Sequence, residues 1–241
     1  MRFLITNDDS ITSEVLVPLA TWVKQFGEVT VIVPKYEQSG KSHCIEIHKP
    51  FEIKQVPFDV PEVKAYTVDS SPADCIRYAI EGLKLEFDFI ISGINRGLNV
   101  GIDMLYSGTV GAVFEAACFD IPAVALSTEP GAFDEAMAAL DEIKEFFTKH
   151  DLMKKNSLYN VNIPKNHKGI RVTRMGGRYY ADDFIPQEND MYMPTGKSVW
   201  KDSGDYSIDT NAALTGYISI LPLSLNRTNM DAFHELAQLN N

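Results

Sequence analysis

The chain has 241 residues, of which 45% are apolar, so it is long enough and apolar enough to bury a full core. Its 33 Asp and Glu residues outnumber the 22 Lys and Arg residues, which gives a net charge of -11. This acidic balance argues against binding to nucleic-acid duplexes and to anionic membrane surfaces.

The three cysteines, Cys44, Cys75 and Cys118, are far apart and have no Cys-x-x-Cys or zinc-ligand spacing in the sequence. We therefore expect reduced cysteines in the core of a cytoplasmic protein. No apolar stretch approaches the roughly twenty residues that a membrane span requires, so the sequence predicts no membrane partner.

The first predicted strand, residues 2–6, leads to two adjacent carboxylates, Asp8 and Asp9. At a strand end the chain turns, so both side chains can face one crevice. Close carboxylates repel unless one is protonated, water relaxes the strain, or a cation lies between them. A hard divalent ion is one interpretation. A solvated turn that caps the next helix is the other, and these residues alone favour the cap slightly.

The chain opens with a strand, a helix and a strand, because an amphipathic stretch at 14–27 precedes a β-branched run at 29–33. Such units build a parallel sheet with right-handed crossovers, and ligands bind beyond the carboxyl ends of its strands. The acid pair lies at such an end. So does the polar turn over residues 34–43, which carries Ser39 and, as a weaker candidate for the site, His43.

Residues 44–56 are predicted to form one or two edge strands, and residues 65–68 another strand. A helix from Ser71 to about residue 83 follows, with serine as its N-cap and proline at its first position. We interpret this helix start as structural and give anion binding less weight there.

A strand over residues 88–92 leads into a glycine-rich loop, residues 93–101, that carries Asn95 and Asn99. Glycines at intervals of four suit a backbone that comes close to a ligand while the amides point inward. The loop matches neither the Gly-x-Gly-x-x-Gly dinucleotide pattern nor a Walker loop.

The helix that follows, through Cys118, begins at Ser107, Gly108 and Thr109. Hydroxyls and free backbone amides at a helix start form a ready phosphate cradle, because the positive end of the helix dipole faces the ligand. A plain N-cap is the alternative, and it is the commoner arrangement.

The rest of the chain predicts further strands and helices of the same α/β domain, with no repeat and no clean linker. Strands are expected at 123–127, 159–164, 170–175 and 216–223, and helices at 133–150 and 230–239. Residues 176–209 are polar and irregular, so we interpret them as a protruding arm that serves function or oligomer contact. We expect a single domain over residues 1–241, closed by a strand and a helix within 216–240.

Four loops that each follow a predicted strand carry oxygen ligands or phosphate-binding groups. They are the loops with Asp8 and Asp9, with Ser39, with Asn95 and Asn99, and with Ser107 to Thr109. Two carboxylates, a hydroxyl and an amide oxygen, completed by waters, match the oxygen preference of Mg²⁺ or Mn²⁺.

Several motifs run in order along nearly the whole chain. They are Thr6-Asn7-Asp8-Asp9, Ser39-Gly40, Ser92-Gly93-Ile94-Asn95 with Gly97 and Asn99, Tyr106-Ser107-Gly108-Thr109-Val110, Asn160-x-Asn162-x-Pro164, Ile170-Arg171-Val172-Thr173-Arg174 and Gly216-Tyr217-Ile218-Ser219. In this combination the chain resembles the survival protein SurE family of nucleotide phosphatases.

The resemblance implies a Rossmann-like α/β fold, a mostly parallel sheet flanked by helices, with an extended C-terminal β arm that exchanges between subunits of a homodimer or homotetramer. It implies a divalent-metal-dependent 5'-nucleotidase that cleaves nucleoside 5'-monophosphates, in some members also 3'-nucleotides or polyphosphate. By position, one Mg²⁺ or Mn²⁺ ion would bind the catalytic Asp8 and Asp9 together with Ser39 and Asn95. The substrate phosphate would lie at Asn99, Ser107, Gly108 and Thr109.

The chain departs from the family pattern at three places that spare these expected ligands. Ser10 stands where the family usually has glycine, Ser13-Glu14 where a small residue and glycine are usual, and Ser70-Ser71-Pro72 where Gly-Thr-Pro is typical. A non-glycine residue at position 10 must tolerate the local turn, or the turn differs.

Three hypotheses for the chemistry follow. In the first, a metal ion and a general-base carboxylate drive in-line attack of water on a phosphomonoester. In the second, Asp8 is a nucleophile that forms an aspartyl-phosphate; this has less weight, because phosphatases of the haloacid dehalogenase type use Asp-x-Asp. In the third, the loops belong to a nucleotide-binding regulatory module without turnover.

Overall fold

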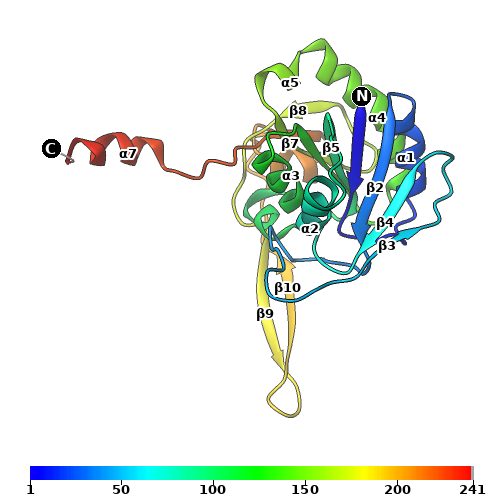
Figure 1. Cartoon of the computed structure of the whole chain (residues 1–241). Coiled ribbons are helices and arrows are strands. Elements are labelled where there is room, and N and C mark those ends of the chain that lie inside the picture. Colours follow the sequence, from blue (N-terminus) through cyan, green and yellow to red (C-terminus); the bar gives the residue numbers. More distant parts are fainter. Residues whose placement is uncertain (240–241) are drawn as a thin grey trace.

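The computed structural model describes residues 1–239, so residue 240 of the predicted closing segment lies outside the described part. Its centre is a nine-stranded sheet in the order β3-β4-β2-β1-β5-β6-β7-β11-β8 (Figure 1). The strands are β1 (Arg2–Thr6), β2 (Glu28–Pro34), β3 (Ile53–Val56), β4 (Lys64–Val68), β5 (Phe89–Arg96), β6 (Ala123–Thr128), β7 (Leu158–Ile163), β8 (Ile170–Val172) and β11 (Ile218–Pro222). Pairing is parallel except between β3 and β4 and between β7 and β11.

Helices cover both faces of the sheet. On one face lie α1 (Leu16–Lys24) and α4 (Phe133–Lys149), and on the other lie α2 (Pro72–Arg77) and α3 (Gly108–Cys118). Because side chains alternate along a strand, Phe3 and Ile5 of β1 pack in the first core and Leu4 packs in the second. This double burial explains the continuous apolar run that opens the chain.

The remaining helical elements are short. They are α5 (Leu152–Lys155), α6 (Asp209–Leu214), α7 (Met230–Leu236), a π-helical turn (Tyr78–Gly82) and the 3-10 helices η2 (Gly101–Tyr106) and η3 (Ala237–Leu239). Among residues 1–239, no helix combines the length and the apolar character that a membrane-spanning helix needs.

The sheet has its topological switch point at β1. Strand β1 pairs with β2 on one side and with β5 on the other. Asp8 and Asp9 directly follow β1, so they lie at the crevice where ligands bind in open parallel sheets. The predicted Rossmann-like α/β fold is thereby confirmed, together with the expected position of the acid pair at the carboxyl end of the sheet.

One strand prediction is confirmed and one needs correction. The edge strand expected within residues 44–56 is β3, and the Glu46 carboxylate accepts hydrogen bonds from the amides of His48 and Lys49 in a turn before it. Strand β5 runs on to Arg96, where its ladder with β6 resumes after a register shift. Asn95 is therefore part of a strand rather than of a free loop.

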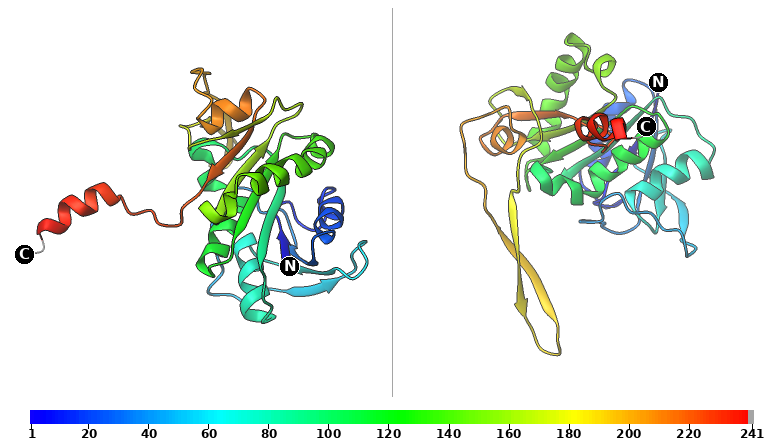
Figure 2. Two further views of the ribbon diagram at one scale, coloured as in Figure 1. Left: turned by 90° about the horizontal axis from the view of Figure 1, so that it is seen from above. Right: turned by 90° about the vertical axis from the view of Figure 1, so that its left-hand side faces the viewer.

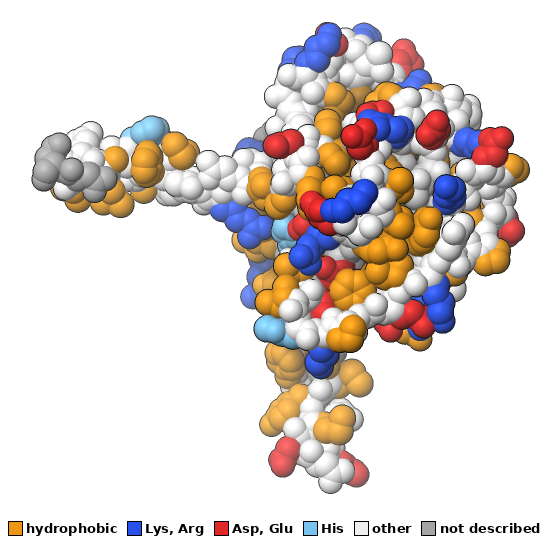
Figure 3. Space-filling model, in the orientation of Figure 1, with side chains coloured by type: hydrophobic (Ala, Val, Ile, Leu, Met, Phe, Trp, Pro, Cys, Tyr) orange, Lys and Arg blue, Asp and Glu red, His pale blue; other side chains and the backbone are white. Residues whose placement is uncertain are grey.

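The segment at 176–209 is not irregular throughout. It contains β9 (Tyr180–Pro186) and β10 (Tyr192–Ser198), an antiparallel hairpin that projects from the body in Figures 1 and 2. The hairpin buries neither face against the body, so it lacks the apolar and polar alternation by which strands are predicted. Figure 3 shows apolar side chains along this arm and along α7.

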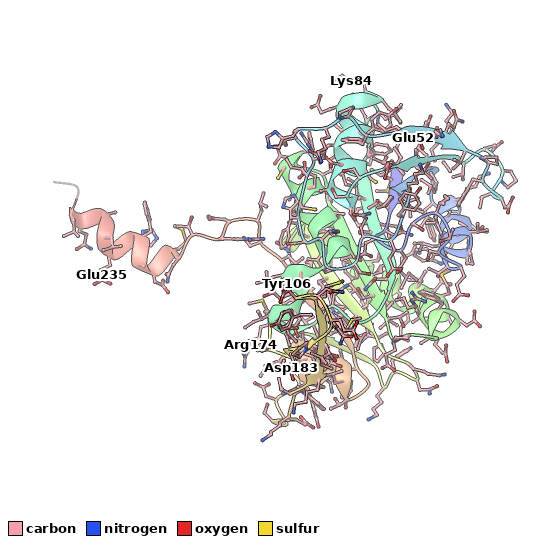
Figure 4. The ribbon with its side chains drawn as sticks, turned by 90° about the horizontal axis from the view of Figure 1, so that it is seen from below. Glu52, Lys84, Tyr106, Arg174, Asp183 and Glu235 are labelled. Carbon is pink, nitrogen blue, oxygen red and sulfur yellow. The ribbon has the colours of Figure 1, made fainter. Side chains whose placement is uncertain are left out.

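Helix α7 also stands away from the body. In Figure 4 its residue Glu235 lies apart from Tyr106 and Arg174, which belong to the body. The apolar side chains of Met230, Phe233 and Leu236 are exposed on this helix. Among residues 1–239, no apolar surface covers these three side chains.

The cysteines are all free, as expected, but only Cys75 lies in the core. Cys44 and Cys118 are exposed, so the core prediction is wrong for these two. Cys44 lies in the segment that does not form a strand, and Cys118 ends α3 at the surface.

Candidate functional site

Asp8 is held by the first turn of α3. Its Oδ1 accepts a hydrogen bond from the Thr109 hydroxyl at 2.6 Å, and its Oδ2 accepts one from the Thr109 amide at 3.2 Å. Burial raises the pKa of Asp8 to about 6, and the Asp9 charge adds to this, although the hydrogen bond from Thr109 opposes it. A buried carboxylate that is costly to ionise marks this position as a functional-site candidate.

The acid pair does not cap the next helix. Helix α1 has Val15 at its N-cap position and no side-chain cap. The interpretation of Asp8 and Asp9 as a capping turn is therefore wrong, and the physical reason is that Asp8 is buried against α3 instead.

The start of α3 comes unusually close to Asp8 because residue 108 is glycine. A Cβ atom on Gly108 would lie 3.1 Å from both Cβ and Oδ2 of Asp8. The Ser107 side chain is the N-cap and accepts a hydrogen bond from the Val110 amide at 3.2 Å. The plain N-cap alternative is thus confirmed for Ser107, and the helix N-terminus still faces the acid pair.

Asp9 is half-buried and keeps an oxygen available. Its Oδ2 accepts a hydrogen bond from the Arg96 amide at 3.0 Å, and within residues 1–239 no protein group donates to its Oδ1. Burial raises the pKa of Asp9 against the opposing effect of that amide. The neighbouring Asn95 donates its Nδ2 to the Gly97 carbonyl at 2.8 Å, which leaves its amide oxygen as an acceptor.

Ser39 lies next to a residue that contacts the acid pair. The amide of Gln38 donates to the Asp8 carbonyl at 2.8 Å, so Ser39 follows directly on a contact with the acid pair. The Ser39 hydroxyl is exposed and donates to Glu37 Oε1 at 2.8 Å. Glu37, Asp9 and Arg96 line an open hollow of about 280 Å³, together with Thr12, Ser13, Glu14 and Phe133.

Two asparagines of β7, Asn160 and Asn162, hold the backbone of Asn99, a role that the sequence did not predict. Asn162 accepts from the Asn99 amide at 2.7 Å and donates to its carbonyl at 2.9 Å, and Asn160 donates to the same carbonyl at 2.7 Å. The Asn99 side chain donates to Ser127 at 2.8 Å. The signal for this role was present, because two amides at alternate positions of an apolar strand share one face.

Contacts link several of the predicted site residues to the acid pair. Asp8 bonds to Thr109, which follows Ser107 and Gly108 at the start of α3, and Asp9 bonds to the amide of Arg96, the neighbour of Asn95. Ser39 and Asn99 are linked through neighbouring residues, because Gln38 contacts Asp8 and Asn99 contacts Ser127, which pairs with Asn95 across the sheet. Asp8, Asp9, Ser39 and Asn95 all offer oxygen atoms as ligands, and burial raises the pKa of both acids. This donor set fits a hard divalent ion such as Mg²⁺ or Mn²⁺.

The turn after the acid pair accommodates Ser10 in a conformation that favours glycine. Ser10 has a φ of 70°. The Asn7 side chain donates to the Ser10 carbonyl at 2.9 Å, and the hydroxyls of Ser10 and Thr12 lie 2.9 Å apart. The turn typical of a glycine is therefore kept, and local hydrogen bonds offset its strain.

Known proteins with similar sequences cover the whole chain. The family model described as survival protein SurE matches residues 3–182. A protein named 5'-nucleotidase SurE from Alkaliphilus metalliredigens is 37% identical over 252 residues, which cover 100% of this chain and 99% of that protein. One of the same name from Caldanaerobacter subterraneus is 38% identical over 248 residues, with 97% and 95% covered.

A solved structure agrees with the sequence comparison. The crystal structure of the SurE protein from Aquifex aeolicus matches with a TM-score of 0.79 at 29% identity, and the match covers 100% of both chains. The chain therefore belongs to the survival protein SurE family.

Proposed function

We propose that this protein is a divalent-metal-dependent 5'-nucleotidase that hydrolyses nucleoside 5'-monophosphates to nucleoside and phosphate. The observation that carries the proposal is the convergence, at the end of β1, of two acids, further oxygen donors and the N-terminus of α3. Full-length relatives that are named 5'-nucleotidase support the substrate class.

Asp8, Asp9, Ser39 and Asn95 would hold one Mg²⁺ or Mn²⁺ ion per subunit. When bound, such an ion offsets the charge of a phosphate oxygen and acidifies a water molecule. A chain with a net charge of -11 needs such a local positive charge to accept an anionic substrate.

The helix start and the adjacent loop would orient the phosphate. The helix start at Ser107, Gly108 and Thr109 and the side chain of Asn99 would bind its remaining oxygens, and the phosphate would then share or replace the bonds that Thr109 makes to Asp8 and that Asn99 makes to Ser127. Because Asn160 and Asn162 fix the backbone of Asn99, this part of the site is ordered before substrate binds.

We assign the general base to Asp9. Its Oδ1 is uncommitted among the described residues, and its raised pKa suits a group that takes a proton from the attacking water. The water oxygen forms a bond to phosphorus while the bond from phosphorus to the nucleoside oxygen breaks. The nucleoside oxygen takes a proton from solvent and leaves as an alcohol, and Asp9 returns the proton of the attacking water to solvent. Both oxygens of Asp8 accept from Thr109, which makes Asp8 a poor nucleophile.

Phosphate release from a panel of nucleoside 5'- and 3'-monophosphates and polyphosphate tests the proposal. We expect 5'-monophosphates to be hydrolysed, activity to be lost after treatment with EDTA and restored by Mn²⁺, and Asp9→Asn to be inactive under all conditions. Full activity in EDTA would refute the metal role. Tight nucleotide binding without phosphate release, even with Mn²⁺, would favour the regulatory module, and a phosphate-labelled protein would favour nucleophilic Asp8.

We further propose a homodimer or homotetramer assembled through the hairpin and the C-terminal segment. Phe184 and Met191 of the hairpin are 62% and 65% exposed, which is costly for a monomer in water. Light scattering should give a multiple of 26.9 kDa, and a charged residue at Phe184 should lower it. A mass of one chain for the wild type would refute the assembly.

The remaining proposals concern organisation and location. Residues 1–241 would form one unit with its arm at 176–209, so thermal unfolding should show one cooperative transition; two separate transitions would refute this. The three free cysteines suit a reducing compartment such as the cytoplasm.

A further inference from the structure

A second cluster of metal-ligand side chains lies outside the acid-pair site. It consists of His43, Glu115 and Cys118, whose ligand atoms all lie within 4.8 Å of one another. His43 Nε2 and Glu115 Oε2 are 2.6 Å apart. The cluster offers a nitrogen, an oxygen and a sulfur, whereas the acid-pair site offers oxygens alone.

The backbone fixes the positions of these side chains. Glu115 and Cys118 are three residues apart on α3, so they lie on one side of the helix. The segment before His43 is bound to the end of η2, just before the same helix, because Ser42 donates from its amide to the Tyr106 carbonyl at 2.9 Å and from its hydroxyl to the Leu105 carbonyl at 2.6 Å.

Gly111 makes this close approach of the loop to α3 achievable. A Cβ atom at Gly111 would collide with the carbonyl of Ser42. The loop and the helix are therefore in direct backbone contact one residue before His43. Metal binding would replace the hydrogen bond between His43 and Glu115, and the one from Cys118 Sγ to the Phe114 carbonyl at 3.4 Å, by bonds to the metal.

We propose that His43, Glu115 and Cys118 bind a Zn²⁺ ion, with a water molecule as the fourth ligand. Zinc takes nitrogen, sulfur and oxygen ligands in tetrahedral sites, while Mg²⁺ and Mn²⁺ prefer oxygen. Cys118 is exposed, so the fourth position opens to solvent.

Arg77 lies beside the Glu115 carboxylate. Its Nε lies 3.9 Å from Glu115 Oε1, the carboxylate oxygen that does not contact His43. The same arginine donates to Asp74 at 2.8 Å, which holds it in place. Arg77 can thus orient the carboxylate from behind while Glu115 Oε2 faces the metal, in the way that outer partners orient metal ligands.

Zinc at this position would join the loop that carries Ser39 to the helix that carries Thr109. The inference does not depend on the proposed nucleotidase activity, because it concerns a separate set of ligands. It adds a site for a borderline-soft metal to a protein whose acid-pair site suits a hard one.

Titration of the metal-free protein with Co²⁺, a spectroscopic substitute for zinc, tests the proposal. A cobalt-bound thiolate gives a near-ultraviolet charge-transfer band, which cobalt at an oxygen site such as the acid pair does not give. We expect this band to rise to a plateau that corresponds to one cobalt-bound thiolate per chain in the wild type and in Cys44→Ser, the matched control at another exposed cysteine, and to be absent in Cys118→Ser.

Zinc affinity in competition with a chelator gives a second readout. His43→Ala should weaken zinc binding at least about 10-fold, with an unchanged circular dichroism spectrum. No charge-transfer band in the wild type, a band that survives in Cys118→Ser, or a band that is lost in Cys44→Ser would each overturn the proposal.

Discussion

Thr109 donates two hydrogen bonds to Asp8 from 101 positions away in the chain, one from its hydroxyl at 2.6 Å and one from its amide at 3.2 Å. These bonds join the end of β1 to the start of α3. They favour the ionised form of a carboxylate whose burial favours the protonated one. Thr109 therefore helps to keep Asp8 available as a ligand.

Thr109→Val should lower kcat about 10- to 100-fold. The substitution keeps the shape of the side chain but removes the hydroxyl donor, and a hydrogen bond to a charged group contributes about 1.5–3 kcal/mol. The pKa of Asp8 rises further, so the acid limb of the pH profile moves to higher pH. Thr109→Ser keeps the donor and should stay close to wild type; equal losses in both variants would contradict this role.

Asp8→Asn should stabilise the metal-free protein at neutral pH. The pKa of Asp8 is about 6 in the folded chain against an ordinary 3.8, so the folded state binds more protons between these pH values. The contribution of Asp8 to the free energy of unfolding therefore falls as the pH rises from about 4 to about 6, and it does not return at higher pH. An asparagine stays neutral and can still pair with the amide and hydroxyl of Thr109.

Unfolding in EDTA measures this effect. The free energy of unfolding of Asp8→Asn should exceed that of the wild type by about 1–3 kcal/mol at pH 7.5. This difference should disappear near pH 4. A gap that is absent at pH 7.5, or that is equally large at both pH values, would show that burial of Asp8 is not costly.

Asn162→Ala should lower kcat/KM about 10- to 100-fold, because the backbone of Asn99 loses two hydrogen bonds and the loop can shift. Asn156→Ala is the matched control. It removes hydrogen bonds to the carbonyls of Leu158 and Leu223, outside the site, so it should lower stability and leave kcat/KM nearly unchanged. Similar kinetics in the two variants would rule out a positioning role for Asn162.

The effect of a substitution at Ser10 on stability should depend on how well the new residue adopts the φ of 70° at that position. Ser10→Gly should leave the free energy of unfolding within about 1 kcal/mol of wild type, because relief of strain and loss of chain stiffness nearly cancel. Ser10→Val should lower it by about 2 kcal/mol, since a β-branched residue is poorly tolerated there. Chemical denaturation checks both values, and a stable Ser10→Val would contradict the left-handed turn.

Local sequence signals predicted the elements that build the site. The apolar run of β1, the βαβ opening and the serine start of α3 depend on neighbouring residues, and each is in the structure close to its expected place. These signals placed Asp8 and Ser107 at the carboxyl end of the sheet without any tertiary information.

The remaining features depend on contacts between distant residues. The pairing of Thr109 with Asp8 follows from how α3 packs on the sheet. The support of Asn99 by Asn162 arises because Asn99, after β5, contacts Ser127 of β6, which pairs with Asn162 of β7. The strands of the hairpin could not be predicted, because an alternation of apolar and polar residues arises only where one face of a strand packs on a core. Sequence periodicity reports only such burial.

Anomalous scattering from crystals grown with Mn²⁺ shows whether Asp8 and Asp9 share a divalent ion with Ser39 and Asn95. We expect one strong peak at the end of β1, with oxygens of these residues or of bridging waters as its ligands. Crystals of a protein that Mn²⁺ activates, with no peak at this position, would refute a shared ion.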